Sequence, residues 1–539
     1  MKKQLLLAVF LILVSSSVLF SGTTGKIAGV ITDSETGDPL IGVNVVIEGT
    51  LLGTATDKDG YFVILNVPPG KYTVQASYIG YVDYTVTDAW VNIDLTTTLD
   101  MRMKPTVIAG EEVTVVAERP VVQRDVSAST ANIESSQIDA LPVQSLNDVV
   151  GLQAGIQGLS IRGGGSDELA FMVDGITLRD ERDNSPITGV SLSAIQDVQI
   201  QTGGFNAEYG NIRSGVITVV TKEGDPHHYS GTIDYENSPP AAKHFGRSFN
   251  DPNSYWLRPY LDPAVAFVGT ENGSWDEAMQ AQYPSFEGWN AISKLTLSNN
   301  DPSDDLTPQA AQRLFTWQHR RQLDITKPDY IIDAGFGGPV PIVSQNLGKL
   351  RFYASYRGER QMYMIPLSRG AYLQNNLQIK LTSDITNSMK LTVAGFYNKR
   401  EGTPDNDTGQ PGLFTTPSSE AEVFTDAGFT IASRFFFDSY WAISDVDRYN
   451  ISLKLNHTLS PSTFYEAKLE HTHTKYFTRP GAERDTSRIY QIVPGYFVDA
   501  APFGSEQQIV TGVDGMLMGV RPNAHDSSRI STTTFKFAD

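Results

Sequence analysis

Three consecutive glycines, Gly163, Gly164 and Gly165, are the first residues whose type and spacing could do chemistry. A glycine-rich loop binds phosphate when its N–H groups converge where a helix begins and a Lys-Ser/Thr pair follows. No such pair follows here, and no helical pattern opens after Gly165. The run instead favours a compact, turn-rich unit, because glycine permits positive φ and close approach of backbones.

Acidic and histidine side chains elsewhere offer other chemistry, and each has a simpler explanation. Asp57 and Asp59 lie in TDKDGY, where an Asp-Gly turn explains them and two carboxylates cannot fill a calcium site. His471 and His473 stand two apart on an expected strand, a spacing that permits a shared metal, but no third ligand can be named. No nucleophile, base and orienting group occur together. We therefore expect no metal, no cofactor and no catalytic site.

Composition limits the elements that could position such residues. The chain has 539 residues, with 10% aromatic residues, 19% charged residues and 46 glycines, a balance that favours β-rich structure. Its net charge of -19 argues against a nucleic-acid partner, because phosphate neutralisation needs clustered Lys and Arg. The absence of cysteine excludes disulfides, thiolate zinc sites and cysteine nucleophiles.

Residues 1–22 predict a secretory signal peptide. Lys2 and Lys3 precede an apolar run over residues 5–14, and small residues follow as far as Gly22. We expect cleavage between residues 17 and 25. The alternative, a retained membrane anchor, is disfavoured because the run is short for a spanning helix. No long apolar run follows, so any membrane passage must use amphipathic strands.

Residues 25–105 predict a small β-sandwich, and the fold class as a whole is expected to be mainly β. Short alternating runs are separated by turn signals at residues 37–39, 59–60 and 68–70. The unit resembles the carboxypeptidase-regulatory-like, transthyretin-related domain. The matching segments are GVITDSETGDPLIGVNV near its start and TDKDGYF in its centre.

Two later blocks, IRGGGSDELAFMVDGI (161–176) and IQDVQIQTGGFNAEYGNIRSGVITVVTK (195–222), resemble the plug domain of TonB-dependent outer-membrane receptors. The residues that carry this resemblance are Ile161, Arg162, Gly163, Gly164, Gly165, Val173, Asp174, Gly175, Tyr209, Gly210, Gly215, Val216, Ile217, Thr221 and Lys222. Residues 201–204 read Gln-Thr-Gly-Gly where the family usually has Leu-Arg-Gly-Pro, and this departure weakens any inference of an iron-siderophore ligand.

The resemblance places an α+β plug at residues 125–225. A helix is expected from Ser145 as N-cap, with Asp148 at the capping-box position and Leu146, Val149, Val150 and Leu152 on one apolar side. Because such a plug sits inside a barrel, its charged residues are expected to meet water or pair with the barrel wall, and not to act as acid and base. They are Arg162, Asp167, Glu168, Asp174, Arg179, Asp180, Glu181, Arg182 and Asp183.

Residues 110–118 join the two domains and resemble a TonB box in position and composition. The segment is Glu112, Val113, Thr114, Val115, Val116 and Ala117. It is extended and apolar, and Pro120 disfavours a helix beyond it. A short strand of this kind can add to the sheet edge of a partner through backbone hydrogen bonds. The alternative is an ordinary linker or plug strand.

Residues 228–539 predict part of a transmembrane antiparallel β-barrel. Eight segments read as strands: 228–236, 329–338, 349–358, 372–383, 389–398, 448–460, 463–476 and 532–537. In two of them apolar residues at one parity alternate with polar residues at the other, over residues 350–357 and 451–456. The lengths are near the roughly ten residues that a tilted strand needs to cross a bilayer. Long and short connections alternate, as in outer-membrane barrels.

Barrels that enclose a plug have about 22 strands, and an open sheet with exposed edges is unstable in lipid. We therefore interpret the chain as the N-terminal fragment of a longer receptor. Its long loops carry aromatic residues at 255–256, 435–437 and 440–441, which are candidates for ligand contact or for aromatic girdles.

The resemblance implies a receptor that imports a ligand across the outer membrane, without enzymatic activity. Energy would come from a TonB-type inner-membrane complex, lipid would surround the barrel, and the N-terminal domains would lie in the periplasm. A surface lipoprotein is a further candidate partner. The alternative function is a plug-containing adhesion or secretion-linked protein that imports nothing. The sequence leaves the ligand open among siderophores, glycans, peptides and other molecules.

Overall fold

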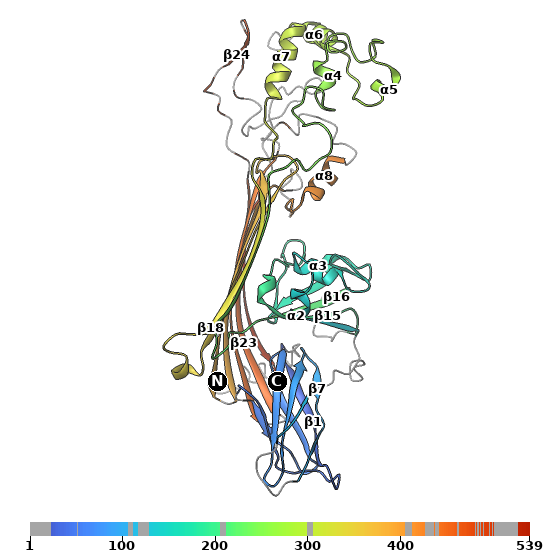
Figure 1. The fold of residues 1–539 in the computed structure, drawn as a ribbon. Coiled ribbons are helices and arrows are strands. Elements are labelled where there is room, and N and C mark those ends of the chain that lie inside the picture. The colour runs from blue at the N-terminus through green and yellow to red at the C-terminus, as the bar shows by residue number, and fades with distance from the viewer. Residues whose placement is uncertain are drawn as a thin grey trace, which may run out of the picture.

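The computed structural model places three parts, an N-terminal domain, a plug and a cap, around one long, twisted sheet (Figure 1). The described residues are 23–538, except 51, 106–111, 117–128, 205–211, 299–304, 387, 405–411, 426–435, 437–440, 461–462, 480, 482–484, 486, 489, 495, 499 and 501–525. The signal peptide predicted over residues 1–22 lies outside them. In Figure 1 an N-terminal domain in blue lies below a plug in cyan and green, and both lie beside the sheet.

The N-terminal domain consists of two β-sheets. One has the order β4-β1-β7, with β8 also paired to β1, and the other has the order β3-β2-β5-β6-β9. The strands are β1 (Gly25–Asp33), β2 (Asn44–Ile47), β3 (Gly53–Ala55), β4 (Tyr61–Val67), β5 (Gly70–Ser77), β6 (Asp83–Val91), β7 (Thr96–Thr98), β8 (Met101–Met103) and β9 (Glu112–Val116). Alternate apolar residues such as Ile27, Val45, Phe62 and Val74 are buried in its core, as the period-2 pattern predicts.

The Asp-Gly turn predicted in TDKDGY forms at the start of β4. The carboxylate of Asp57 accepts hydrogen bonds from the N–H groups of Asp59 and Tyr61, both at 2.9 Å, and Gly60 has a φ of 69°. The two aspartates are therefore accounted for by turn geometry.

The plug is a five-stranded mixed sheet of order β10-β15-β16-β13-β14, carrying two short helices. Its elements are β10 (Thr130–Glu134), α2 (Ser135–Asp139), α3 (Leu146–Gly151), β11 (Ile156–Gln157), β12 (Ser160–Ile161), η1 (Ser166–Glu168), β13 (Leu169–Val173), β14 (Ile176–Thr177), η2 (Leu192–Ala194), β15 (Ile195–Gln201) and β16 (Gly215–Thr221). Ser145 and Asp148 form the expected capping box of α3. Leu146, Val149 and Val150 are buried, but Leu152 is the C-cap and is 60% exposed, so its place on the apolar side was predicted wrongly.

The long sheet, which we call the wall, has eight antiparallel strands in sequence order. They are β17 (Ser230–Ser238), β18 (Asp329–Pro339), β19 (Arg351–Met362), β20 (Ala371–Thr386), β21 (Met389–Gly402), β22 (Ile443–Ser460), β23 (Thr463–Arg479) and β26 (Asp526–Ala538). Each overlaps a segment predicted from the sequence. Each wall strand pairs with the next wall strand along the chain, whether the connection is short, as between β20 and β21, or long, as between β17 and β18.

The wall has polar residues on its inner face and apolar residues on its outer face. On β20 the inner residues Asn376, Gln378 and Lys380 are buried against the plug, while Leu377 and Ile379 are exposed on the outer face. The predicted alternation also holds on β19 and β22, where Arg351, Ser355, Arg357, Asn450 and Ser452 are buried, and Tyr356, Ile451 and Leu453 are exposed. This polarity is the reverse of that in a water-soluble sandwich.

Loops at one end of the wall fold together into a helical cap, at the top of Figure 1. Its elements are α4 (Arg258–Leu261), α5 (Glu277–Gln280), α6 (Trp289–Ser298), α7 (Pro308–Gln318), α8 (Pro417–Thr425) and the hairpin β24 (Tyr490–Val493) with β25 (Tyr496–Val498). The short 3-10 helix η3 (Gln345–Leu347) lies in another loop, between β18 and β19. One apolar core joins the cap elements other than α5, and it includes Trp289, Phe315, Phe414, Phe436 and Trp441. No described helix is long and apolar enough to cross a membrane.

Candidate functional site

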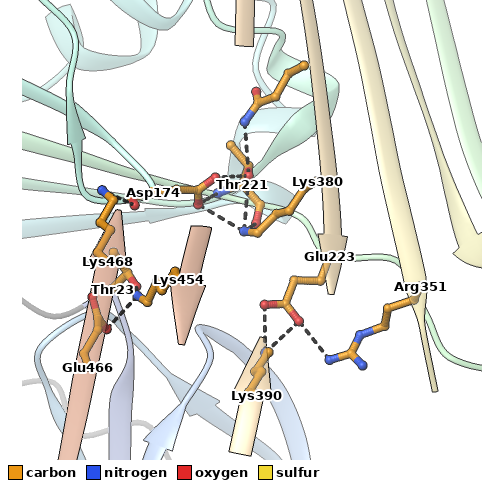
Figure 2. Close-up of polar contacts among 11 residues, drawn as sticks. Thr23, Asp174, Thr221, Glu223, Arg351, Lys380, Lys390, Lys454, Glu466 and Lys468 are labelled. Carbon is orange, nitrogen blue, oxygen red and sulfur yellow. Dashed lines mark hydrogen bonds and ion pairs between the residues drawn. The ribbon is translucent and has the colours of Figure 1, made fainter. Parts of the chain in front are cut away.

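The plug meets the wall through side chains that a tight turn positions. Asp174 and Gly175 form the two-residue loop between β13 and β14, since Val173 pairs with Ile176. Their φ angles of 49° and 77° are both positive, as a type I′ hairpin requires, and Asp-Gly is a favoured pair for it. The turn projects the Asp174 carboxylate toward the end of β16 and toward the wall (Figure 2).

Asp174 joins the plug to strand β20. Its carboxylate accepts the Thr221 N–H at 3.0 Å and the Thr221 hydroxyl at 2.6 Å. Lys380, on the inner face of β20, places its Nζ 3.1 Å from Asp174 Oδ1 and 2.9 Å from the Thr221 carbonyl oxygen. The Asp174 and Lys380 side chains are only 14% and 7% exposed. The pair is therefore shielded from water and its charges compensate each other.

Glu223 makes a second link, just beyond β16. Its carboxylate accepts hydrogen bonds from Lys390 Nζ at 2.8 Å and from Arg351 Nη2 at 3.1 Å (Figure 2). Arg351 also binds Asp384 at 2.8 Å. Burial opposes ionisation of Glu223, but the charges of Lys390, Lys380 and Arg351 outweigh it and lower the pKa of the carboxyl. Glu223 is thus held as an anion against three wall cations.

The next residue, Gly224, leads from the plug to the wall at very close range. A Cβ at this position would lie 2.2 Å from the Phe352 carbonyl oxygen and 2.9 Å from that of Gly338. A side chain would collide with the backbones of β18 and β19, so the connection requires glycine. We call Asp174, Thr221 and Glu223, with their wall partners Lys380, Lys390 and Arg351, the lower cluster.

Asp333, on the inner face of β18, forms the second contact. It receives the Ser191 hydroxyl at 2.6 Å, the Leu192 N–H at 2.8 Å and the Ser193 N–H at 3.1 Å. A carboxylate of the wall therefore caps the first turn of η2, where N–H groups lack intrahelical partners. Tyr353 fixes the same turn by donating its hydroxyl to the Ser193 carbonyl oxygen at 2.7 Å.

Asp180 forms the third contact, and it is 2% exposed. It accepts the Tyr476 hydroxyl at 2.8 Å and Arg182 Nε at 3.2 Å, and Arg400 Nη2 lies 3.4 Å from its other oxygen. The Arg182 guanidinium also stacks over the Tyr476 ring at 3.7 Å. Burial opposes ionisation of Asp180, but the hydrogen bond and charge of Arg182 outweigh it and lower the pKa. These interactions bring β21 and β23 into contact with the plug.

The three contacts hold the plug in place against the wall. Charged and polar side chains of five wall strands, β18 to β21 and β23, hold one plug without leaving its buried carboxylates unpaired. Ion pairs of this kind add positional specificity more than net stability, because desolvation offsets much of their attraction. They can also separate and re-form once water enters. The arrangement is suited to holding and releasing a domain.

The plug motif residues take structural positions in this unit. Val173, Gly175, Gly215, Val216, Ile217 and Thr221 lie in or beside β13 and β16, which pair in parallel. Ile161 is buried at the end of β12, and Arg162 and Gly163 follow with φ of 52° and 81°. Gly164 packs on Ser214, and Gly165 precedes η1. Lys222 donates its N–H to the Ala194 carbonyl oxygen at 2.7 Å. Tyr209 and Gly210 lie outside the described residues.

The unusual segment at residues 201–204 packs against the first motif. A Cβ on Gly203 would lie 3.0 Å from Arg162 Nη1, so the arginine passes directly over this glycine. Thr202 donates its N–H to the Ser129 carbonyl oxygen at 2.9 Å, and this bond extends the β10–β15 ladder.

The nine charged plug residues named from the sequence fall into two groups: some pair with the wall, and others interact within the plug. Asp174 and Asp180 pair with the wall as expected. Glu168 pairs instead with Arg213 of the plug, and Arg179 pairs with Glu181. Asp183 accepts the Ser185 N–H in a local turn. Asp167 lies in η1 with an exposed side chain.

The predicted TonB-box residues Glu112 to Val116 form β9, and Ala117 lies outside the described residues. β9 runs parallel to β6 at the edge of the N-terminal domain, with Val115 opposite Val86. Val115 and Val116 are 39% and 61% exposed. The segment is extended, as both interpretations of it required.

Sequence reasoning missed Glu223 and the wall residues Asp333, Lys380, Lys390, Arg400 and Tyr476. A signal was present for several of them, because a charged residue at an inward position of an otherwise alternating strand needs a partner. The pairings themselves join residues up to 296 positions apart, as for Asp180 and Tyr476, and no local pattern encodes them.

Other candidates lie away from this site. His471 and His473 are on the outer side of β23, where Tyr449 lies 6.0 Å and 5.1 Å from them between ring centroids. No group of three or more His, Cys, Asp or Glu in the described part of the chain could hold a metal ion. Phe436 and Trp441 are buried in the cap core, so their expected ligand or girdle role was wrong. Tyr255 is 49% exposed, Trp256 packs on the cap core, and residues 435, 437 and 440 are not described.

Two family descriptions match the N-terminal part of the chain. Residues 27–115 match a CarboxypepD_reg-like domain, and residues 122–216 match a TonB-dependent Receptor Plug Domain. The first match reaches into β9 and the second covers the plug sheet as far as the start of β16.

The curated relatives that match this chain are named as TonB-dependent receptors. The chain is 29% identical over 246 residues to the TonB-dependent receptor P3 of Formosa agariphila, and 27% identical over 278 residues to the TonB-dependent receptor SusC of Bacteroides thetaiotaomicron. These alignments cover 41% and 47% of this chain, and 23% and 26% of the relatives. The chain thus spans about a quarter of the length of these relatives.

Among solved structures, the siderophore receptor PirA from Acinetobacter baumannii aligns with 75% of this chain and 44% of its own, at 14% identity and a TM-score of 0.38. The curated relatives are named as receptors, in agreement with the expectation that the chain is not an enzyme.

Proposed function

We propose that this chain, a TonB-dependent receptor by its CarboxypepD_reg-like and plug domains, belongs to an outer-membrane transporter that imports a ligand when its plug is pulled from the wall. The observation that carries the proposal is the reversed polarity of the wall. Its polar inner face is buried by the plug, and its apolar outer face, with Leu377, Ile379 and Leu453, has no water-soluble covering among the described residues. Lipid is the natural neighbour of such a face.

The aromatic residues of the outer face support a membrane setting. Tyr356, Tyr397, Tyr449 and His473 occupy one row across β19, β21, β22 and β23, because the register pairs each of them in line with Leu377 of β20. Tyr229 and Phe336 stack on another part of this face, with ring centroids 5.9 Å apart. Aromatic rows flanking an apolar band are typical of the two interfaces of a bilayer.

The connection between β9 and the plug supports a pulling mechanism. A partner that binds residues 112–117 would transmit force through the following residues to β10. β10 is at the edge of the plug sheet, and among the described strands it pairs with β15 alone, over the five positions from Thr130 to Glu134. A pull therefore loads the β10 edge of the plug first. In this proposal a TonB-type inner-membrane complex supplies the force, and the cap faces the outside.

Uptake by cells that produce the full-length receptor tests the proposal. The probes are labelled glycans, peptides and iron chelates, each measured for surface binding and for entry. Deletion of residues 113–117 should abolish entry of the imported probe and leave its surface binding intact. Val115→Pro should act likewise, since proline removes a backbone donor that strand addition uses, whereas Val115→Thr should keep entry.

The alternative function makes a different prediction in the same assay. A surface adhesion or secretion-linked protein would bind a probe without admitting it, in the unaltered receptor as well as in the variants. Entry that is equally fast after deletion of residues 113–117 would refute the assignment of the TonB box. A surface lipoprotein partner would be recognised by its co-purification with the cap-bearing receptor.

A further inference from the structure

The N-terminal domain docks on the plug through the backbone of one residue. Gln199 Nε2 donates to the Ile93 carbonyl oxygen at 2.8 Å, and the Ile93 N–H donates to Asp197 Oδ2 at 3.4 Å. Gln199 and Asp197 both lie on β15 and are 1% and 2% exposed. Gln201 holds the Gln199 side chain in place by donating to its oxygen at 2.9 Å. The buried N–H and carbonyl groups of Ile93 each have a hydrogen-bond partner on the plug, and such pairing defines a specific docking site.

The same domain also contacts the wall. Asn66 Nδ2 donates to the Thr458 hydroxyl of β22 at 3.1 Å. Lys454 Nζ, also on β22, donates to the Thr23 hydroxyl at 2.5 Å and pairs with Glu466 at 2.8 Å (Figure 2). The domain therefore contacts the plug and the wall at once.

The strand to which the N-terminal domain docks is also the strand that holds β10, the plug edge nearest the pulled segment. β15 carries Asp197 and Gln199, and it is the only described partner of β10. Asp197 itself pairs with Glu134, the last residue of β10. Any force that strips β10 from the plug thus acts next to the place where the N-terminal domain is attached.

The docking surface is incompletely packed. A cavity of about 330 Å³ lies where the three parts meet, and it is lined by Asn66 and Tyr72 of the domain, Gln196 and Glu223 of the plug, and Lys390 and Thr458 of the wall. This space is half open to solvent and has room for about ten water molecules. A surface held by a few polar contacts around this cavity can separate without exposing an apolar core.

We propose that the N-terminal domain is a latch, which holds β15 and the plug against the wall while it is docked and must undock before the plug can move. The inference rests on the proposed function for its physiological meaning. Its first test needs no cargo, so the latch and the import proposal can fail separately.

The first test measures hydrogen–deuterium exchange in the purified full-length receptor. Gln199→Met leaves the Ile93 carbonyl oxygen unpaired, so exchange at the Ile93 amide and along β10 should rise by about tenfold. Lys58→Met, which breaks an exposed ion pair with Asp59 inside the domain, is the matched control and should leave both regions unchanged. Unchanged exchange in Gln199→Met would overturn the docking site.

A disulfide separates loss of docking from simple damage to the plug. The 539 residues contain no cysteine, so Asn66→Cys with Thr458→Cys introduces one pair across the domain and the wall. Oxidation of this pair in the Gln199→Met background should return exchange along β10 to the unaltered rate. If exchange stays high although the disulfide has formed, Gln199 acts inside the plug alone and the latch is refuted.

Uptake in cells gives the second test. With the probe that enters through the unaltered receptor, oxidised Asn66→Cys/Thr458→Cys should stop entry, and reduction should restore it. The control is Ser444→Cys/Thr478→Cys, which joins two directly opposed wall residues and should permit entry in both states. Equal entry in the oxidised and reduced docking pair would refute the requirement for undocking.

Discussion

Lys380 is the residue on which the lower cluster depends most directly. Lys380→Met keeps the length of the side chain but leaves Asp174 buried without its wall cation. Breaking a buried pair on one side costs about 3 kcal/mol, so the free energy of opening the plug at β13 and β16 should fall by about that amount. Hydrogen exchange of these strands in the full-length receptor measures it.

A second substitution distinguishes the loss of the ion pair from a loss of packing. Asp174→Asn removes the orphaned charge, so the double variant Lys380→Met/Asp174→Asn should recover part of the loss. Lys58→Met, which breaks the exposed pair with Asp59, should have no measurable effect. A double variant as unstable as the sum of the single variants would mean that the two side chains do not act as a pair.

Glu420, in α8 of the cap, gives a prediction about pH. Its buried carboxyl accepts the N–H groups of Met364 at 2.5 Å and Ile365 at 3.2 Å. Burial raises its pKa from 4.5 to about 8, although both hydrogen bonds favour the charged form. The folded cap therefore binds this proton more tightly than the unfolded chain does. Its contribution to stability is complete below about pH 4.5 and is lost as the pH rises through 8.

The measurement is thermal unfolding of the cap, followed by tryptophan fluorescence, at about pH 7 and about pH 9. Burial lowers the pKa of His319, another buried titratable group of the cap, to about 4, so this histidine stays neutral throughout that range. The melting temperature should fall between the two pH values in the unaltered protein, and Glu420→Gln should remove that fall. The same decrease in the glutamine variant would assign it to another group.

At the scale of elements, the close passage of Gly224 past the wall sets the position of Glu223. In Gly224→Ala the added Cβ would lie 2.2 Å from the Phe352 carbonyl oxygen, so the connection must move away from β19. We expect a loss of about 1–3 kcal/mol in the stability of the plug against the wall. Gly395→Ala in β21 is a matched control, because its nearest atom would be 4.0 Å away.

Protection of the β16 amides from hydrogen exchange measures the effect of both glycine variants. The account expects faster exchange in Gly224→Ala and unchanged exchange in Gly395→Ala. Equal protection in the two variants would show that the connection has room to shift, and that the lower cluster does not depend on this passage.

Alternation made the wall predictable from sequence, while the cap was not expected. In residues 451–456 the apolar parity faces outward and the polar parity inward, and a period of two reveals that much locally. The pattern alone cannot say which face is wet, because the plug that buries Lys380 lies elsewhere in the sequence. The sequence of α7 contains helix signals that the prediction of strands missed. They are Thr307 as N-cap, Pro308 in the first turn and the buried residues Ala310, Ala311, Leu314 and Phe315.

At the scale of the whole molecule, the parts form a series from cap to N-terminal domain along one wall (Figure 1). The turn at Asp174 was foreseeable as Asp-Gly, yet its wall partner Lys380 lies 206 positions away. Long-range pairs of this kind follow from how the plug fits the wall, and one sequence does not fix them. The central claim is that the wall crosses the outer membrane, with the cap outside and the N-terminal domain in the periplasm.

Cysteine labelling in intact cells tests this claim most directly, since residues 1–539 contain no cysteine. Three exposed positions are used one at a time in the full-length receptor: Phe245→Cys in the cap connection, Ile379→Cys on the outer face of the wall and Ile79→Cys in the N-terminal domain. A maleimide that cannot cross membranes should label position 245 in intact cells and position 79 only after the outer membrane is opened. Position 379 should react only with a lipid-soluble reagent. Labelling of position 79 in intact cells with position 245 protected, or rapid aqueous labelling of position 379, would contradict the account.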